Sequence, residues 1–272
     1  MKLRIATWNI NSVRLRIDAV AKFVAAEKPD VLCLQEIKCE DANFPREAFA
    51  AMGLPHVELA GQKAYHGVAT VSRLKLETTA RGDFNGTGEA RHLAVRLAPK
   101  KSGKPLILHN FYVPSGGDIP DPAENSKFAQ KLEFMTQMAK AFPKLGGPKE
   151  ELMLAVGELN IAPLEHDVWS HKDLLKIVSH TPIEVAHFEA MMRAGGWHDV
   201  ARKFVATTEK LYSWWSYRSA DWRTANKGRR LDHMLATPAL SALARGCRVF
   251  AETRGWEQPS DHVPVIADFE FA

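Results

Sequence analysis

Short apolar runs bounded by glycine, proline or charged residues recur along nearly the whole chain, and this pattern constrains the fold more than any other feature. Runs of this length are typical of β-strands, since an amphipathic helix needs a longer periodic segment. The strand candidates are Leu3–Thr7, Val31–Leu34, Gly67–Ser72, Leu93–Leu97, Leu106–Tyr112, Leu152–Val156, Leu231–Ala236, Arg248–Ala251 and Val263–Phe269. The pattern therefore predicts a protein rich in β-sheet.

Helical periodicity is confined to a few longer segments. Apolar residues recur at helical spacing between Val13 and Glu27, and helices are also expected at Ser126–Phe142 and Val185–Ala194. Strands that are only partly interleaved with helices favour an α/β sandwich of two sheets covered by helices over one doubly wound parallel sheet. No low-complexity linker or repeat of ~20–50 residues divides the chain, so we expect one domain over residues 1–272.

Composition narrows the class of protein. A chain of 272 residues with 46% hydrophobic and 25% charged residues is globular, not disordered, collagenous or coiled coil. The net charge of +4 suits a polyanionic partner without establishing one. Three cysteines without a CxxC pair indicate neither a disulfide framework nor a zinc ribbon. Because no apolar run approaches ~18 residues, we expect a cytoplasmic protein without a membrane span.

Polar clusters stand at the edges of several strand candidates that are far apart in sequence. They are Trp8-Asn9-Ile10-Asn11, Gln35-Glu36-Ile37-Lys38, Tyr112-Val113-Pro114, Gly157-Glu158-Leu159-Asn160, Arg229-Arg230-Leu231-Asp232-His233 and Ser260-Asp261-His262. If these strand ends converge, they form one pocket of carboxylates, amides, a phenol and an imidazole. Such a pocket suits Mg²⁺, which takes oxygen ligands and only one or two protein carboxylates, here from Glu36 and Asp261.

Each cluster taken alone also has a purely structural interpretation. Glu36 could be a solvated strand end, His262 a buried structural histidine, and Asp232 an ion-pair partner of the neighbouring arginines. Their joint occurrence at strand edges favours a functional site.

In this order and context, the clusters resemble the exonuclease III family of DNA-repair nucleases and AP endonucleases, within the endonuclease/exonuclease/phosphatase superfamily. The resemblance is collinear from Leu3 to Phe269. The blocks at Gln35–Lys38, Tyr112–Pro114 and Ser213–Arg218 are similar to the branch that acts on DNA.

The resemblance implies a four-layer α/β sandwich of two mixed β-sheets flanked by helices. It implies a Mg²⁺-dependent hydrolase of base-excision repair, in which Mn²⁺ can replace Mg²⁺. Its substrate would be double-stranded DNA, which it would incise 5′ to abasic sites and trim at 3′ ends as a 3′→5′ exonuclease. We expect a monomer.

The resemblance also assigns roles residue by residue. Asn9, Glu36 and Asp261 match the metal site. Tyr112 and His262 match residues that contact the scissile phosphate, with Asp232 orienting His262. Asn160 matches the asparagine of the nucleophile block, and Arg91 resembles an arginine that contacts DNA.

Three positions depart from the family pattern. Glu158 stands where the family has aspartate, and one extra methylene moves the carboxylate by ~1 Å, which can cost on the order of 100-fold in rate. We therefore expect impaired rather than absent catalysis. Ser115 replaces an amide side chain, and Arg229 replaces an apolar residue of the abasic-sugar pocket, where it can bind phosphate instead.

The densest mixture of aromatic and basic residues lies between Leu211 and Arg230. Trp214, Trp215 and Arg218 are therefore expected to contact DNA, although adjacent tryptophans on a strand point to opposite faces and one of them can belong to the core.

Two alternatives stay open at this point. One is a DNA-binding protein that recognises abasic or nicked duplex and has lost catalysis through Glu158. The other is a related hydrolase of RNA, nucleotides or phosphorylated small molecules.

Overall fold

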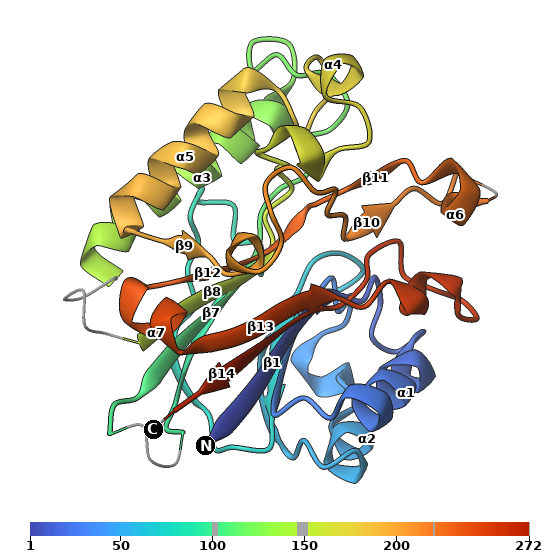
Figure 1. The fold of residues 1–272 in the computed structure, drawn as a ribbon. Helices are drawn as coiled ribbons and strands as arrows, with labels where there is room; N and C mark the ends of the chain where they lie inside the picture. The colour runs from blue at the N-terminus through green and yellow to red at the C-terminus, as the bar shows by residue number, and fades with distance from the viewer. Residues whose placement is uncertain (100–102, 146–151, 220, 272) are drawn as a thin grey trace.

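Two β-sheets pack face to face and helices cover their outer faces, as Figure 1 shows. The computed structural model describes residues 1–99, 103–145, 152–219 and 221–271. Within these residues the first sheet has the strand order β13-β14-β1-β2-β4-β3 and the second the order β5-β6-β7-β8-β12-β9. The expected four-layer α/β sandwich is confirmed.

Each large sheet has six strands in the described part of the chain. The first contains β1 (Lys2–Asn9), β2 (Val31–Gln35), β3 (His56–Ala60), β4 (Val68–Ser72), β13 (Ala244–Val249) and β14 (Val265–Glu270). The second contains β5 (Glu77–Ala80), β6 (His92–Leu97), β7 (Leu106–Tyr112), β8 (Leu152–Glu158), β9 (His198–Asp199) and β12 (Asp232–Ala236). A separate two-stranded ribbon is formed by β10 (Trp214–Trp215) and β11 (Gly228–Arg229).

The pairing makes both sheets mixed. β1 runs parallel to β2, and β7 runs parallel to β8, whereas β14, β12 and β4 pair antiparallel with their neighbours. The carboxyl ends of two parallel strands meet at one edge of a sheet, so each sheet brings two such ends to the same edge.

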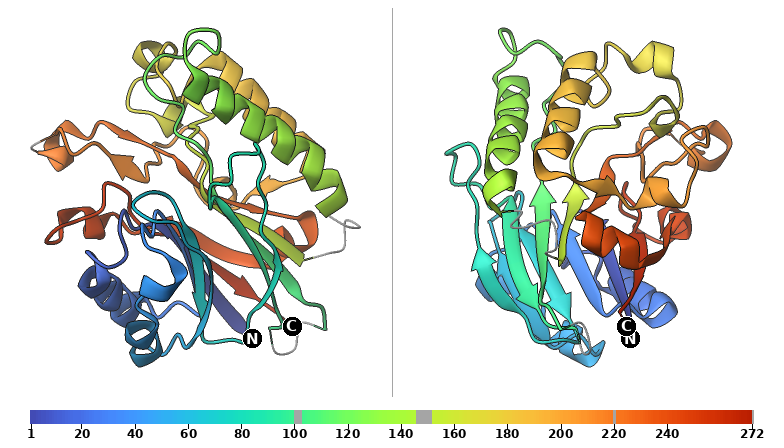
Figure 2. Two further views of the ribbon diagram at one scale, coloured as in Figure 1. Left: turned by 180° about the vertical axis from the view of Figure 1, so that it is seen from behind. Right: turned by 60° about the vertical axis from the view of Figure 1, so that its left-hand side comes forward.

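The outer layers are helical. The α-helices are α1 (Ile17–Glu27), α2 (Arg46–Ala51), α3 (Ser126–Leu145), α4 (His171–Leu174), α5 (Pro182–Gly195), α6 (Trp222–Ala225) and α7 (Pro238–Leu243). α1 and α2 lie over the first sheet, and α3 and α5 run side by side over the second (Figures 1 and 2). No helix among the described residues combines the length and apolar character that crossing a bilayer requires.

The core follows these layers. Ile5, Leu108 and Val156 lie fully buried between the two sheets, whereas Phe23 and Phe134 pack between a sheet and its helices. Strands that are buried on both faces cannot alternate apolar and polar residues, which explains the continuous apolar runs in the sequence.

The structure corrects two expected boundaries. The strand expected at Arg248–Ala251 runs instead over Ala244–Val249, because only Ala244 and Cys247 of β13 are buried and the exposed Arg245 and Arg248 interrupt the apolar pattern. The helix expected from Val13 begins at Ile17, since the backbone N–H of Val13 is held by the carbonyl oxygen of Ile37.

Candidate active site

Contacts bring six of the predicted side chains together. The carboxyl ends of β1, β7 and β8 lie at the end of the sandwich away from the chain termini (Figure 1). The six side chains come from the carboxyl ends of β1, β2, β7 and β8, from the first residue of β12, and from the loop before β14. The converging residues are Asn9, Glu36, Tyr112, Glu158, Asp232 and His262.

Glu36 is the acceptor at the centre of this group. The Asn9 amide and the Tyr112 hydroxyl both donate to its Oε1 over 2.9 Å, and Lys38 Nζ lies 2.8 Å from its Oε2. Burial raises the pKa of this carboxyl, but Lys38 and Asn9 outweigh burial and lower the pKa below its ordinary value. Glu36 is therefore ionised at neutral pH.

Glu158 lies deeper and reaches two of the neighbours. Asn9 donates from the same amide nitrogen to Glu158 Oε2, and His262 Nε2 lies 3.4 Å from Glu158 Oε1. Burial, and then the charges of Glu36 and Asp232, raise the pKa of Glu158 to about 8 against the opposing effect of His262. The pocket thus contains more carboxylate than its own cations neutralise.

His262 is held on its other side by Asp232. Its Nδ1 lies 2.8 Å from Asp232 Oδ2, which also accepts a 2.6 Å hydrogen bond from the Ser213 hydroxyl. Burial alone would lower the pKa of His262, but Asp232 and Glu158 raise it well above its ordinary value. The ring is therefore an imidazolium whose Nε2 points toward Glu158.

Asp261 is linked to Glu36 through the side chains of Asn11 and Lys38. Its Oδ2 accepts a 3.0 Å bond from Trp214 Nε1, and its Oδ1 accepts a 3.3 Å bond from the Asn11 amide. Asn11 in turn accepts from Lys38 Nζ over 2.6 Å, and Lys38 contacts Glu36. Asp261 and Glu36 thus border one polar space without touching.

The donor chemistry of this space fits a hard cation. In the described part of the chain, no three His, Cys, Asp or Glu side chains are grouped as a closed metal cage. Mg²⁺ does not need one, because it keeps several waters and binds through one or two carboxylates. The oxygen ligands beside Glu36 therefore suit Mg²⁺ better than zinc.

A buried polar bridge lies directly beneath the site, and sequence reasoning missed it. Gln35 donates over 2.7 Å to the side-chain oxygen of Asn110, and Asn110 donates to the carbonyl oxygens of Leu34 and Ala69. These bonds join the first sheet to the second. The only sequence signal was the polar pair His109-Asn110 inside an otherwise apolar strand. No sequence feature indicated that the Ser213 hydroxyl donates a hydrogen bond to Asp232.

Other predicted residues lie around the group rather than in it. The Asn160 amide donates to the carbonyl oxygen of Val113 over 2.9 Å and not to Glu36. Arg91 is buried behind Tyr112, with its guanidinium 4.7 Å from the centre of that ring and bonded to Glu89. Ser115 is exposed at the start of the loop that follows β7.

The adjacent residues Trp214 and Trp215 of β10 point to opposite faces of the ribbon, as successive residues of a strand do. Trp214 is half-buried beside Asp261, and the Arg229 guanidinium lies 5.4 Å from the centre of its ring. Trp215 is buried and its Nε1 bonds to Asn226, so its side chain belongs to a small core and not to the surface. Arg218 is exposed.

Comparison with known proteins identifies the family of this chain. The sequence profile described as the Endonuclease/Exonuclease/phosphatase family matches residues 6–262. The chain belongs to this family. Its relatives place it in the exonuclease III and AP endonuclease branch.

Three family members illustrate the likeness. Exodeoxyribonuclease III of Haemophilus influenzae is 29% identical, over 98% of this chain and 100% of the relative. An AP endonuclease from Archaeoglobus fulgidus is 30% identical with a TM-score of 0.90, over 98% of this chain and 99% of that one. The 3′ phosphatase NExo from Neisseria, solved with a product DNA hairpin, is 30% identical with a TM-score of 0.86, over 98% and 99% of the two chains.

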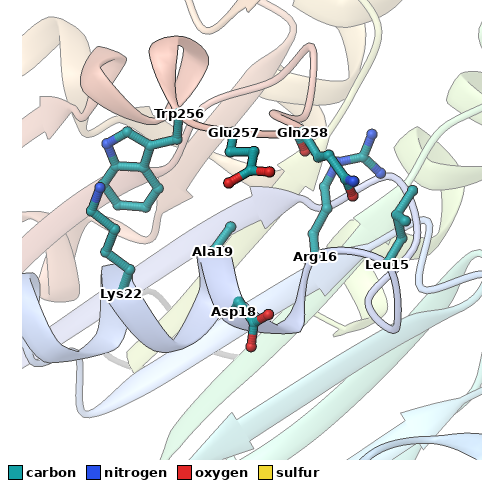
Figure 3. Close-up of a pocket in the computed structure, with 8 residues that line it drawn as sticks. All are labelled: Leu15, Arg16, Asp18, Ala19, Lys22, Trp256, Glu257 and Gln258. Atoms are coloured by element: carbon teal, nitrogen blue, oxygen red, sulfur yellow. The ribbon is translucent and has the colours of Figure 1, made fainter.

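A cleft of about 310 Å³ lies next to this family site, between α1 and residues 256–258. Figure 3 shows Lys22 against the ring of Trp256, with Glu257 and Asp18 nearby. Its lining carries both signs of charge and none of the converging residues. Arg16 connects the two regions, because its guanidinium donates to the carbonyl oxygens of Gln258 and Asn11. We therefore assign the chemistry to the strand ends and not to this cleft.

Proposed function

We propose that this protein is a Mg²⁺-dependent DNA phosphodiesterase of base-excision repair that incises 5′ to abasic sites and trims 3′ ends. The observation that carries the proposal is the grouping of an ionised Glu36 and an Asp232-held imidazolium around one buried carboxyl group, Glu158, which Asn9 links to Glu36 and which His262 contacts. The family membership and the named activities of the relatives support it.

Asn9, Glu36 and Asp261 would hold the cation. Bound there, Mg²⁺, or Mn²⁺ in its place, neutralises charge on the phosphoryl oxygens and stabilises the departing 3′ oxygen. The contact of Asn9 with Glu36, and the link from Glu36 to Asp261 through Lys38 and Asn11, support this assignment.

The side chains of the chain itself divide the remaining work. His262 would donate a charge-assisted hydrogen bond from Nε2 to a phosphoryl oxygen, and Asp232 would keep the ring protonated and aimed. Glu158 would orient the attacking water and, in its ionised form, accept the proton of that water as the new P–O bond forms and the P–O3′ bond breaks. The Tyr112 hydroxyl would bond to the phosphate once the substrate draws it from Glu36.

DNA contacts are proposed around this centre. Trp214 and Arg218 lie at the surface of the β10–β11 ribbon and the loop that follows β10, where a ring can stack on a nucleotide and a guanidinium can bind phosphate. Arg229 has no carboxylate partner among the described residues: its Nη1 donates to the carbonyl oxygen of Val178 and to Ser179 Oγ. A cation without a counter-ion beside the site suits a phosphate.

We further propose a monomeric, single-domain protein of the cytoplasm. All three cysteines are free and buried, which suits a reducing compartment.

The test is cleavage of three labelled substrates, namely abasic duplex, duplex with a recessed 3′ end and RNA, each with Mg²⁺ and with EDTA. We expect metal-dependent cutting of both DNA substrates, and slower or no cutting of RNA. Cutting that EDTA does not affect would overturn the mechanism, and a preference for RNA would support the related RNA hydrolase instead.

One observation favours a second candidate, a DNA-binding protein with little turnover. Glu158 lies against His262 Nε2, the atom that would face the phosphate. The substrate must displace this contact before His262 can act. Tight binding of abasic duplex without cleavage would identify this case.

A further inference from the structure

A buried ion pair lies behind the candidate site, between the two helices that cover the second sheet. Lys131 of α3 contacts Glu184 of α5, and both side chains are 0% exposed. Removing two charges from water costs several kcal/mol per ion, and apolar residues of similar volume are often as stabilising. The pair therefore needs a reason beyond stability.

The reason lies in the other bonds of Lys131. Its Nζ also donates to the carbonyl oxygen of Asn160 over 2.7 Å and to that of Ser115 over 3.2 Å. An ammonium has three donors, and each of them has an acceptor here. The side chain passes over Gly116, where an added Cβ would lie 2.9 Å from Lys131 Cδ. Lys131 thus ties two loops together from behind.

The carboxylate of Glu184, like the ammonium of Lys131, is held by several hydrogen bonds. Its two oxygens accept from the backbone N–H of Ser179, from the backbone N–H of Thr181 over 3.1 Å and from the Thr181 hydroxyl over 2.6 Å. These bonds also cap the first turn of α5. Because Glu184 cannot move, the ammonium that it holds cannot move either.

The two tied loops carry the candidate site. Asn160 is two residues after Glu158, and its backbone has a φ of +57°, a conformation that a residue other than glycine adopts at a cost. Its amide bonds to Val113, the residue after Tyr112, and the N–H of Val113 bonds to the carbonyl oxygen of Glu158. Lys131 fastens this unit at Asn160 and at Ser115.

We propose that Lys131 and Glu184 are positioning residues that set the loops after β7 and β8, and through them the placement of Tyr112 and Glu158. The consequence for turnover depends on the function proposed above, whereas the consequence for loop geometry does not. Misplacement of reacting groups by ~1 Å can cost on the order of 100-fold in rate.

The experiment compares Lys131→Met, the double variant Lys131→Met/Glu184→Gln, and Val24→Ala as a control. Val24 is buried on α1, in a core cluster that contains no residue of either loop. Lys131→Met leaves a carboxylate buried without its cation, so we expect a lower melting temperature. The double variant removes that charge, while the amide oxygen introduced by Glu184→Gln still accepts from Ser179 and Thr181, so its melting temperature should largely recover.

Turnover then separates positioning from stability. We expect kcat on abasic duplex to fall about 10- to 100-fold in both Lys131 variants with little change in KM, and to stay at the wild-type level in Val24→Ala. Recovery of kcat together with the melting temperature in the double variant would overturn the proposal.

Hydrogen exchange provides a readout that needs no activity. In the double variant, amide exchange should accelerate in peptides covering residues 112–117 and 158–162 and stay unchanged elsewhere. If the wild type cuts no substrate but this local acceleration is seen, the proposed function fails and the positioning role stands. Unchanged exchange in both segments would overturn the positioning role, whether or not the wild type is active.

Discussion

At the scale of single residues, Glu158 decides how far this site matches its family. The carboxylate reaches both the Asn9 amide and His262 Nε2, which lies 3.4 Å away. It therefore crosses the space in which a phosphate would meet the imidazolium. An aspartate on the same backbone would stop about one methylene short.

Shortening this side chain should free His262. We expect Glu158→Asp to raise kcat on abasic duplex about 10- to 100-fold, because the carboxylate then leaves Nε2 open and returns to the reach typical of the family. Single-turnover cleavage of the two proteins measures this, and Glu158→Gln is the control that keeps the length and removes the charge. Equal rates for wild type and Glu158→Asp would contradict the argument.

Trp214 is the second residue with a specific consequence. Its ring is half-exposed on one side and bonded to Asp261 on the other. Loss of base stacking costs about 1–3 kcal/mol, so Trp214→Ala should raise the Kd for abasic duplex about tenfold. Fluorescence anisotropy gives the Kd, and urea unfolding gives the stability.

The matched control is Trp256→Ala, which removes a half-buried tryptophan from the neighbouring cleft. A folded Trp214→Ala protein with an unchanged Kd would refute the DNA contact.

At the scale of elements, the two sheets meet through a polar bridge in an otherwise apolar interface. Asn110 of β7 donates to the carbonyl oxygens of Leu34 and Ala69, and Gln35 donates to Asn110. Because Glu36 follows Gln35 and Tyr112 ends β7, this bridge sets the relation between two residues of the site.

Breaking the bridge should destabilise the fold. Asn110→Val leaves the Gln35 amide without its Asn110 acceptor and two carbonyl groups without their Asn110 donor, so we expect a loss of about 2–4 kcal/mol in the free energy of unfolding. Urea unfolding measures the loss. Leu108→Val, a truncation on the same strand in the same interface, should cost about 1 kcal/mol. If the two variants lose the same stability, the bridge has no special role.

At the scale of the whole molecule, buried histidines make stability depend on pH. Burial lowers the pKa of His109 to about 4. Its Nδ1 lies 3.0 Å from His92 Nε2, and burial also lowers the pKa of His92 well below its ordinary value. Below about pH 6.5 the unfolded chain binds a proton at His109 that the folded chain refuses, so this contribution to stability is lost as the pH falls toward 4.

A variant that cannot titrate isolates this contribution. His109→Gln keeps a polar partner for His92 and removes the proton. We expect the stability advantage of wild type over the variant to shrink by about 3 kcal/mol between pH 7 and pH 4. Urea unfolding across this range measures it. The carboxylates and the histidines other than His92, which contacts His109, titrate alike in both proteins and cancel. A difference that does not change with pH would contradict the prediction.

Much of this architecture could be predicted from the sequence because a run of neighbouring apolar residues indicates a buried strand. β7 lies where its mostly apolar run predicts it, at Leu106–Tyr112, since a strand covered on both faces is mostly apolar. β13 was misplaced, because a strand at the sheet edge mixes exposed arginines with its buried residues. The edge strands β3 and β5 were missed for the same reason.

The sequence by itself determined which residue types could act, their order, and the family to which they point. Only the tertiary structure decided which of them meet: Glu158 with His262, Tyr112 with Glu36, and Asn160 with Val113 instead of the central group. It also revealed Lys131 and Glu184, which no local pattern distinguishes from a solvated lysine and a helix-capping glutamate. Such contacts depend on how two sheets and two helices pack across long sequence separations. The type of a residue indicates whether it is buried, but it does not indicate which distant residue it will contact.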